Sequence, residues 1–377
     1  MKNVSVNFFE LKGTSYEIGK QLGYMVLENP YLKDFFLSSF KAVSEDEKYI
    51  YELFDNYCPG LNEELQGFAD ILRVEKSRLI YVSLTYLSPA CSQIVILPNK
   101  TKNHHIFLAR NYDYSEQMDD FCFSKTTVKG KYSHVGTNVM QFGRGEGMNE
   151  CGLAVSQSAC GRPVNNYQAG KHPKVVGLQF WAVVRTLLEN CKNVKEALDT
   201  LSDMPIGCNI NLMLADKSGE AALIEIMDGR KEVKLIQDDM KVDYLIATNH
   251  IHISSMMSME PYATKNSITR YRCLKQWITQ NSNIDELKIK KLLLTPYPDG
   301  LMLPFYEDSF GTIKSIVFNL SLGNIEICWG GLETNKWYLF NIKDNVERKT
   351  CIQNIKKQPT VNGFFDIEPI EGQKDLF

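Results

Sequence analysis

Cys91, Arg110 and Asp113 are the residues whose types and spacing suggest chemistry in this 377-residue chain. Cys91 opens one short apolar segment, and Arg110 and Asp113 close the next, so two adjacent strands would gather a nucleophile, a cation and a carboxylate. A nearby cation lowers the pKa of a thiol and makes the sulfur reactive near neutral pH. A cysteine in apolar surroundings is inert, and the spacing alone equally allows a small buried residue at a strand start.

The composition narrows the classes of function. Hydrophobic residues make up 44% of the chain and charged residues 23%, which is typical of a folded globular protein rather than a disordered or fibrous one. The 42 Lys and Arg residues nearly balance the 45 Asp and Glu residues, giving a formal net charge of -3. We therefore expect no nucleic-acid partner and no polybasic attachment to a membrane.

The amino terminus and the cysteines bear on the compartment. The first residues lack the apolar run of a signal peptide, and no segment approaches the ~18 consecutive apolar residues of a membrane-spanning helix. The ten cysteines are scattered singly without a CxxC pair, which favours reduced thiols over a disulfide framework. These features predict a soluble, cytoplasmic protein.

The elements that must position the three residues differ between the two parts of the chain. Apolar residues at helical spacing predict three or four helices in the first ninety residues, including one over residues 61–72. Short segments rich in branched residues then predict strands at 93–97, 106–109, 153–156, 211–214, 221–225 and 244–247. Helices are expected within 177–190 and 268–280, and a strand pair at 315–319 and 325–329 is expected to close the chain. The pattern predicts a layered α+β domain preceded by a helical segment.

Two other motifs predict no bound group. Gly143, Gly145 and Gly147 resemble a phosphate-binding loop, but no Lys-Ser/Thr follows them, so we expect a turn. His250 and His252 have no third ligand at metal spacing, so neither a metal nor a cofactor is expected.

The segment Arg110-Asn-Tyr-Asp113, following a Cys-Ser strand, resembles the linear-amide C–N hydrolases of the amino-terminal-nucleophile (Ntn) superfamily, which include choloylglycine (bile-salt) hydrolases and penicillin V acylases. The resemblance is closer to the acyl-coenzyme A:6-aminopenicillanic acid acyltransferase group. It covers about residues 10 to 335, in ordered pieces at 13–23, 59–70, 147–153, 214–220, 247–249, 267–271 and 311–317. It implies a four-layer αββα Ntn-hydrolase sandwich over residues 91–377 and a helical prosegment over residues 1–90.

The resemblance also implies a role for Cys91. The chain would be cut behind Ala90, as in a zymogen that activates itself by autoproteolysis, and Cys91 would become an amino-terminal residue. An amide nitrogen cannot accept a proton, whereas a free α-amine with a pKa of about 8 can take the thiol proton and return it to a leaving group. One residue would then supply both the nucleophile and the base.

Four further residues match the catalytic positions of the family. Asp113 would orient the new ammonium, Arg110 would favour the thiolate, and Asn249 would donate its amide to the tetrahedral oxyanion, where one donor is worth about 3 to 4 kcal/mol. Arg270 completes the set. Taken singly, these residues could equally be a strand-end ion pair, a turn residue and an exposed helix charge.

Two positions depart from the family pattern. Ala90 stands where the acyltransferase relatives have Gly before the nucleophile, and Gly tolerates a strained peptide at lower cost than Ala. Ala159 stands where bile-salt hydrolases have an Asn that helps to bind the oxyanion. A backbone N–H at residue 159 can still donate, but the side-chain contribution is lost.

Three functions follow as alternatives. The first is a self-processing cysteine amidohydrolase that cleaves a linear amide of a small N-acyl compound through a thioester on Cys91. The second is an acyltransferase that passes the same acyl group, for example from acyl-coenzyme A, to an amine. The third is an uncut binding protein that holds small ligands without turnover. Aromatic residues around Tyr112, Tyr114 and Phe121 could line the acyl site, and the sequence is compatible with a homo-oligomer of processed heterodimers.

Overall fold

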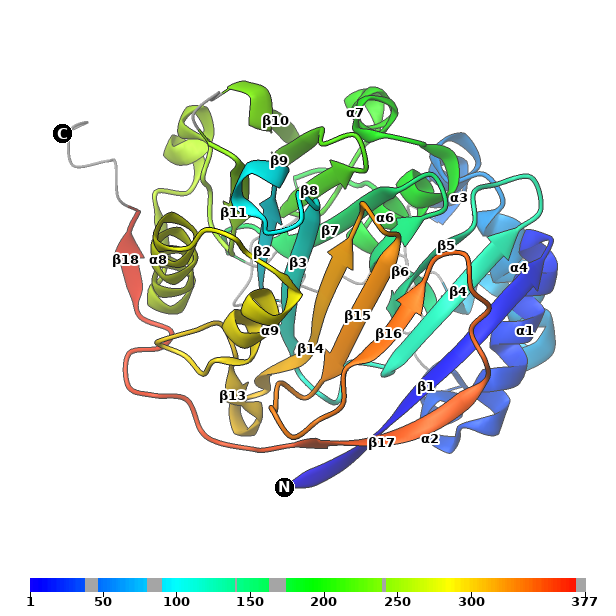
Figure 1. Ribbon diagram of the computed structural model, residues 1–377. Coiled ribbons are helices and arrows are strands. Elements are labelled where there is room, and N and C mark those ends of the chain that lie inside the picture. Colours follow the sequence, from blue (N-terminus) through cyan, green and yellow to red (C-terminus); the bar gives the residue numbers. More distant parts are fainter. Residues whose placement is uncertain (38–46, 80–89, 140, 163–173, 239–241, 371–377) are drawn as a thin grey trace.

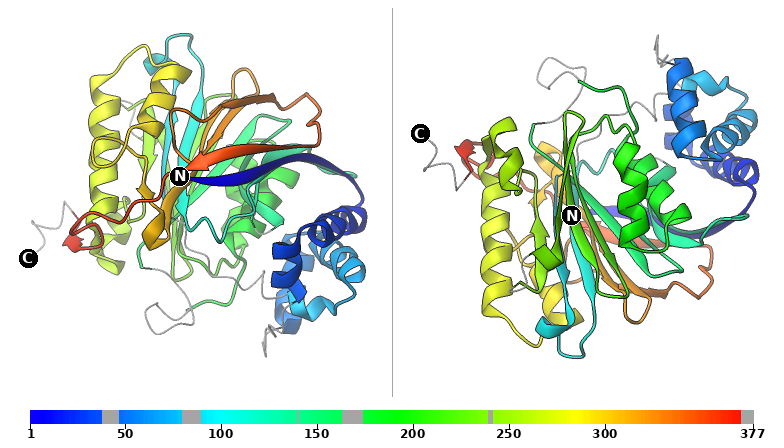
Figure 2. Two further views of the ribbon diagram at one scale, coloured as in Figure 1. Left: turned by 90° about the horizontal axis from the view of Figure 1, so that it is seen from below. Right: turned by 90° about the horizontal axis from the view of Figure 1, so that it is seen from above.

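Two β-sheets packed face to face form the centre of the molecule, and helices cover both outer faces (Figures 1 and 2). This computed structural model describes the chain except for residues 38–46, 80–89, 140, 163–173, 239–241 and 371–377. The four layers confirm the predicted α+β class and the αββα arrangement.

The first sheet has nine strands and includes both early and late parts of the chain. Its strands are, in spatial order, β10 (Arg230–Leu235), β9 (Ala221–Met227), β8 (Ile210–Asp216), β7 (Leu153–Ala159), β6 (Phe142–Asn149), β5 (His134–Val139), β4 (Cys122–Val128), β1 (Lys2–Gly13) and β17 (Lys349–Ile355). Strand β1 is parallel to β4 and antiparallel to β17.

The second sheet carries the predicted nucleophile. Its main path is β11 (Tyr244–Ala247), β2 (Ala90–Ile96), β3 (Phe107–Tyr114), β14 (Phe310–Asn319), β15 (Asn324–Trp329) and β16 (Tyr338–Asn341), with the short β13 (Pro304–Phe305) beside β14. A separate two-stranded sheet joins β12 (Tyr262–Thr264) to β18 (Ile367–Pro369).

The helices divide between the two outer faces. One group lies on the side of the nine-stranded sheet: α1 (Ser15–Glu28), α2 (Pro30–Leu37), α3 (Glu47–Tyr57), α4 (Leu61–Leu72), α6 (Phe180–Asn190) and α7 (Val194–Asp203). The other group, α8 (Lys265–Gln280) and α9 (Glu286–Leu294), covers the second sheet. Short 3₁₀ turns occur at Lys76–Leu79, Pro98–Lys100, Ile236–Asp238, Ser254–Met259 and Tyr306–Asp308.

Three apolar clusters hold the layers together. The largest joins α1 to α4, α6 and α7 to the nine-stranded sheet, the second fills the space between the sheets, and the third lies under α8 and α9. A buried ion pair adds to the first cluster, because Arg185 on α6 donates to Glu64 on α4 at 2.5 Å. The amino-terminal helices therefore share their core with the rest of the protein.

Most predicted elements are confirmed, including α4 over residues 61–72 and the six strands between residues 93 and 247. Three expectations are wrong. Residues 2–13 form a strand within the segment predicted as helical, because Val6 and Phe8 face the space between the sheets while Phe9 and Leu11 face the helices. The hairpin at 315–329 does not close the chain, since β16, β17 and β18 follow it.

The third correction concerns the glycines of β6, where a turn was expected. Residues 142–149 are a fully buried strand on which α6 lies closely. Gly143 has a φ of +60°, and a Cβ there would lie 2.4 Å from the ring of Trp181. The absence of a side chain thus permits the contact between strand and helix rather than a turn.

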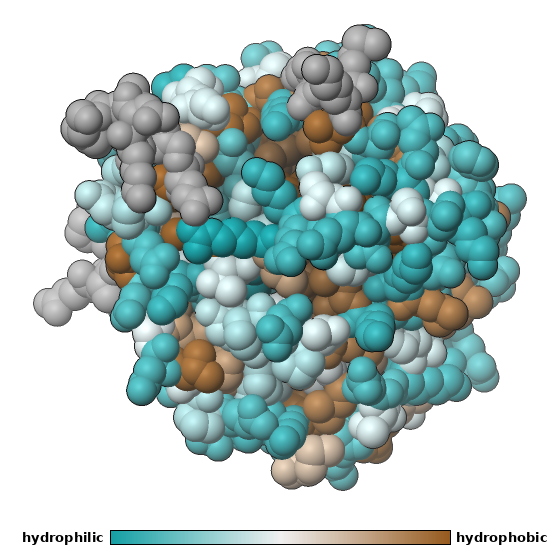
Figure 3. Space-filling view, turned by 60° about the vertical axis from the view of Figure 1, so that its left-hand side comes forward, coloured by the Kyte–Doolittle hydropathy of each residue, from teal (hydrophilic) through white to brown (hydrophobic). Residues whose placement is uncertain are grey.

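The surface shows apolar residues in several separate places among polar ones on the face drawn in Figure 3. Among the described helices, none combines the length and the apolar character needed to cross a membrane. All ten cysteines lie in the described part of the chain and are free thiols.

Candidate active site

Strands β2 and β3 place Cys91 beside Arg110 and Asp113, as the sequence predicted. The two strands are antiparallel, with Ala90 opposite Asp113 and Gln93 opposite Arg110. Arg110 Nη2 donates a hydrogen bond of 2.7 Å to Cys91 Sγ. The side chains of Cys91, Arg110 and Asp113 are all fully buried.

Asn249 and Arg270 complete the cluster around the backbone of Cys91. The Cys91 N–H donates to Asn249 Oδ1 at 3.1 Å, and Arg270 Nη1 donates to the Cys91 carbonyl oxygen at 2.8 Å. Arg270 Nη2 also donates to Asn249 Oδ1, at 2.8 Å. The structure therefore brings all five predicted residues together, and Arg270 is fully buried rather than an exposed helix charge.

The charge of Arg110 is shared between the thiol and a carboxylate that sequence reasoning missed. Glu146 on β6 accepts from Arg110 Nη1 at 2.8 Å, and Thr137 donates to the same carboxylate. This contact joins the two sheets. The expected turn at residues 143–147 concealed it, because only a strand there directs Glu146 into the interior.

The surroundings of Cys91 favour the neutral thiol over the thiolate. Burial raises its pKa from 9.0 to about 11, although Arg110 acts in the opposite direction. The expectation that Arg110 would favour the thiolate is thus met in direction but outweighed by desolvation. The sulfur needs a base to remove its proton before it can attack.

The carboxyl group of Asp113 also has a shifted pKa. Burial raises its pKa from 3.8 to about 6, against the opposing effects of Arg270, a hydrogen bond from Thr312 and the charge of Arg110. Thr312 Oγ1 donates to Asp113 Oδ1 at 2.6 Å, and Arg270 Nη1 lies 3.8 Å from Asp113 Oδ2. Thr312 was missed because its position opposite Asp113 depends on the register of β14 against β3.

Asn249 contacts both the Cys91 nitrogen and Ala159. Asn249 Nδ2 donates to the Ala159 carbonyl oxygen at 3.0 Å. The Cys160 N–H donates to the Asn209 carbonyl, so the alternation of an antiparallel ladder turns the N–H and the carbonyl of Ala159 away from β8.

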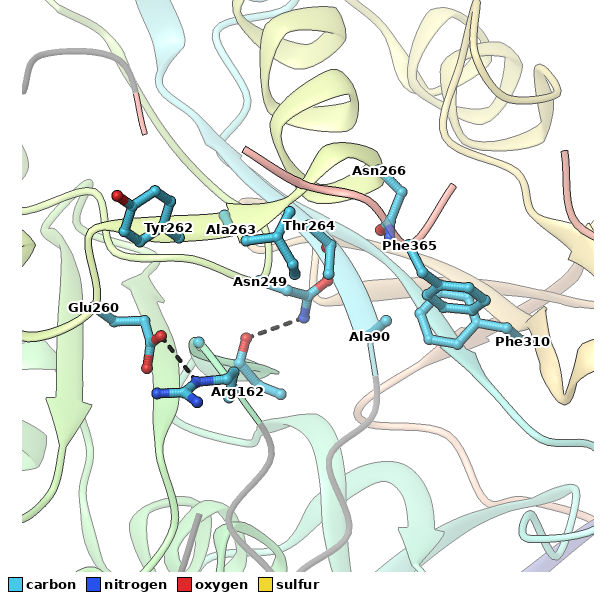
Figure 4. Close-up of a pocket in the computed structure, with 13 residues that line it drawn as sticks. Ala90, Arg162, Asn249, Glu260, Tyr262, Ala263, Thr264, Asn266, Phe310 and Phe365 are labelled. Carbon is cyan, nitrogen blue, oxygen red and sulfur yellow. Dashed lines mark hydrogen bonds and ion pairs between the residues drawn. The ribbon is translucent and has the colours of Figure 1, made fainter. Parts of the chain in front are cut away.

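A cavity of about 540 Å³ opens next to Ala90 and Asn249 (Figure 4). It is lined by Ala90, Ala159, Gly161, Arg162, Asn249, Glu260, Tyr262, Ala263, Thr264, Asn266, Phe310, Phe365 and Ile367. Tyr112, Tyr114 and Phe121 are not among these residues, so the apolar wall predicted there is formed elsewhere. The volume of the cavity is within the usual range for sites that bind small organic molecules.

Within the described residues, no group of three or more His, Cys, Asp or Glu side chains is arranged to hold a metal ion.

A family model matches a large part of the chain. The family model described as acyl-coenzyme A:6-aminopenicillanic acid acyl-transferase matches residues 99–333, which include Arg110, Asp113, Asn249 and Arg270, with Cys91 just ahead of them. No curated protein sequence matches the chain significantly.

Two solved structures are similar to this one. Penicillin V acylase from Agrobacterium tumefaciens is 17% identical over 67% of this chain and 86% of its own, with a TM-score of 0.45. A single-residue variant of conjugated bile acid hydrolase from Clostridium perfringens is 13% identical over 72% of this chain and 99% of its own, with a TM-score of 0.48.

Proposed function

We propose, on the premise that this chain belongs to the acyl-coenzyme A:6-aminopenicillanic acid acyl-transferase family, that it is a self-processing cysteine amidohydrolase. Its substrate would be a small N-acyl compound whose linear amide bond is cleaved through a thioester on Cys91. One observation carries the proposal. The sulfur, nitrogen and carbonyl oxygen of Cys91 each contact a different residue of the predicted set, next to a cavity lined by Ala90.

Self-processing would begin with the peptide bond before Cys91. The thiol loses its proton as the sulfur attacks the carbonyl carbon of Ala90. The C–N bond then breaks, the nitrogen takes up that proton to become a free amine, and the acyl part of the chain moves from nitrogen to sulfur. Water then hydrolyses this thioester, which leaves a carboxylate on Ala90 and a free α-amine and thiol on Cys91. Arg270 would hold the Cys91 carbonyl during these steps, since it donates to that oxygen at 2.8 Å.

The new α-amine would supply the base that the thiol lacks. A thiol with a pKa of about 11 is protonated near neutral pH, whereas an α-amine has an ordinary pKa of about 8 and can accept its proton. Asn249 Oδ1 lies 3.1 Å from the Cys91 nitrogen and would accept a hydrogen bond from the amine, aiming its lone pair at the sulfur. One residue then acts as both nucleophile and base.

Amide cleavage would follow the same path with an external substrate. The sulfur adds to the substrate carbonyl, and Asn249 Nδ2 would turn from the Ala159 carbonyl, to which it now donates at 3.0 Å, to stabilise the negative oxygen. One such donor is typically worth about 10² to 10³ in rate. The α-ammonium returns its proton to the departing amine, a thioester remains, and water releases the acid.

Acyl transfer is a second candidate, because the matched family is described as an acyl-transferase. It uses the same thioester, with an amine in place of water as the acceptor. Added amine would then divert the product from acid to amide, and acyl-coenzyme A would serve as donor. Partition between the two acceptors depends on how far the cavity excludes water.

The proposal is tested by the intact mass of the purified protein under denaturing conditions, beside a Cys91→Ala control. Two fragments from the wild type, separated between Ala90 and Cys91, with an uncut control, would establish self-release of the nucleophile. A wild-type chain that remains whole after prolonged incubation, and that hydrolyses no acyl amide, would overturn the proposal in favour of a binding protein.

A further inference from the structure

The last described segment of the chain, residues 361–370, is called here the C-terminal strap. It lies beyond the residues that match the family model, and it passes beside α8 to end in β18 (Figure 1). We propose that Phe365 and Ile367 of the strap determine which acyl groups the site accepts, selecting uncharged apolar ones over charged or very short ones. This inference rests on the proposed function, because it concerns the same cavity.

The strap is fixed to the protein rather than loosely laid upon it. Strand β18 pairs with β12, and the Lys265 N–H donates to the Asp366 carbonyl at 2.7 Å. Phe364 is 2% exposed and packs in a cluster with Leu303 and Phe305. These contacts give the strap a defined position at the start of α8.

Phe365 lies against Phe364, with 5.0 Å between the ring centroids, and forms part of the cavity wall. Its ring meets that of Phe310 edge-on, with 5.5 Å between the centroids, and both rings line the cavity together with Ile367. Phe365 is 49% exposed and Ile367 59% exposed. Large apolar side chains this exposed at the mouth of a cavity provide surface for a ligand to cover.

The two sides of the cavity differ in polarity. Arg162 and Glu260 form an ion pair of 3.1 Å on one side, and Phe310 and Phe365 lie on the other, with Ala90 between them (Figure 4). A substrate whose carbonyl carbon reaches the sulfur beside Ala90 can place an apolar acyl group against the two rings. A carboxylate there would lose its hydration without gaining a partner, so charged acyl groups are disfavoured.

The test measures how fast the protein hydrolyses p-nitroanilides that differ only in their acyl group. The wild type is expected to prefer octanoyl and phenylacetyl groups to acetyl and succinyl groups. Phe365→Ala combined with Ile367→Ala should lower kcat/KM for the octanoyl compound about ten-fold, while the acetyl compound changes less than about two-fold. Val361→Ala is the matched control, because Val361 is also 49% exposed on the strap but does not line the cavity.

If the double variant loses kcat/KM equally for all four acyl groups, or keeps the selectivity of the wild type, the inference is overturned and the proposed function stays in place. If the wild type hydrolyses none of the compounds, the proposed function fails and binding decides the inference. Calorimetry would then measure the affinity of an octanoyl amide for the Cys91→Ala chain and for the same chain that also carries Phe365→Ala and Ile367→Ala. About ten-fold weaker binding supports the strap as the selecting wall, and equal affinity refutes it.

Discussion

Burial and charge act on Cys91 in opposite directions, and burial prevails. The pKa of its thiol stands at about 11 although Arg110 Nη2 lies 2.7 Å from the sulfur. Desolvation outweighs Arg110, and the charge of Asp113 adds to the rise. Glu146 accepts from the same guanidinium at 2.8 Å, so we expect this carboxylate on the other sheet to offset part of the positive charge that acts on the sulfur.

Glu146→Gln is expected to lower the pKa of Cys91. The guanidinium stays charged at all ordinary pH values, so removing the carboxylate leaves its full field on the sulfur. The rate at which iodoacetamide alkylates Cys91, followed against pH, should reach its midpoint at a lower pH in the variant than in the wild type. Glu150→Gln is the control, because Glu150 is exposed just after β6. An unchanged midpoint in the Glu146 variant would show that the carboxylate does not offset Arg110.

At the residue scale, the sequence identified the side chains nearest the sulfur but not the residues that hydrogen-bond to those side chains. Cys91, Arg110 and Asp113 lie on consecutive strands joined by a short connection, so local pattern was enough to place them together. Glu146 and Thr312 approach from β6 and β14, and their contacts depend on how two sheets stack and on strand register. Neither can be worked out from the spacing of residues along one strand.

Helix α8 connects the strap to the reacting residue. Asn266 in its first turn donates from Nδ2 to the Phe364 carbonyl at 3.0 Å and accepts at Oδ1 from Arg270 Nη2 at 2.7 Å. Arg270, one turn later, holds the Cys91 carbonyl. A single asparagine thus fixes both the cavity wall and an arginine of the site.

Asn266→Asp should separate these two roles. A carboxylate still accepts from Arg270, but it places an oxygen against the Phe364 carbonyl where a donor stood. We expect KM for an octanoyl amide to rise several-fold while kcat stays within about two-fold. Asn266→Ala removes both contacts and should lower kcat as well. Equal effects of the two variants on kcat and KM would contradict the separation.

At the element scale, local signals predicted α4 well and β1 and β6 poorly. The Pro-Gly start and the early acids of α4 are short-range features that fix a helix wherever it packs. In strand β1 the buried residues alternate as Val4, Val6 and Phe8 and then shift by one position to Phe9 and Leu11, so the strand has no single alternating pattern. Gly143 and Gly147 of β6 are explained by close neighbours on α6, Trp181 and Leu188, which no local sequence signal reveals.

Three buried carboxyl groups give the whole molecule a dependence on pH. Burial raises the pKa of Asp113 to about 6, and those of Asp120 and Glu225 to about 7. A carboxyl whose pKa is raised by folding binds its proton more tightly in the folded state. Its contribution to stability is present at acid pH and is lost as the pH rises through the folded pKa.

Glu225→Gln should remove one of these contributions. Between pH 4.5, the ordinary pKa, and about 7, the folded value, the unfolding free energy of the variant should rise relative to wild type by about 3 kcal/mol. Gln keeps an oxygen to accept one of the N–H groups of His252 and Ile253 that Glu225 now accepts. Urea unfolding at several pH values measures the difference. For Glu220→Gln, at an exposed position, the unfolding free energy should change with pH in the same way as for the wild type.

The position of β1 between β4 and β17 sets the order in which the protein can be completed during synthesis. Lys2 pairs with Ile355, so β1 is made more than 300 residues before the strand that covers its second edge. The strap that lines the cavity is made later still. Contacts between such distant parts of a chain form slowly. A ribosome-bound chain ending near residue 333 would therefore hold the matched family region with an open sheet edge and an unfinished cavity, and full-length release would precede any selective binding.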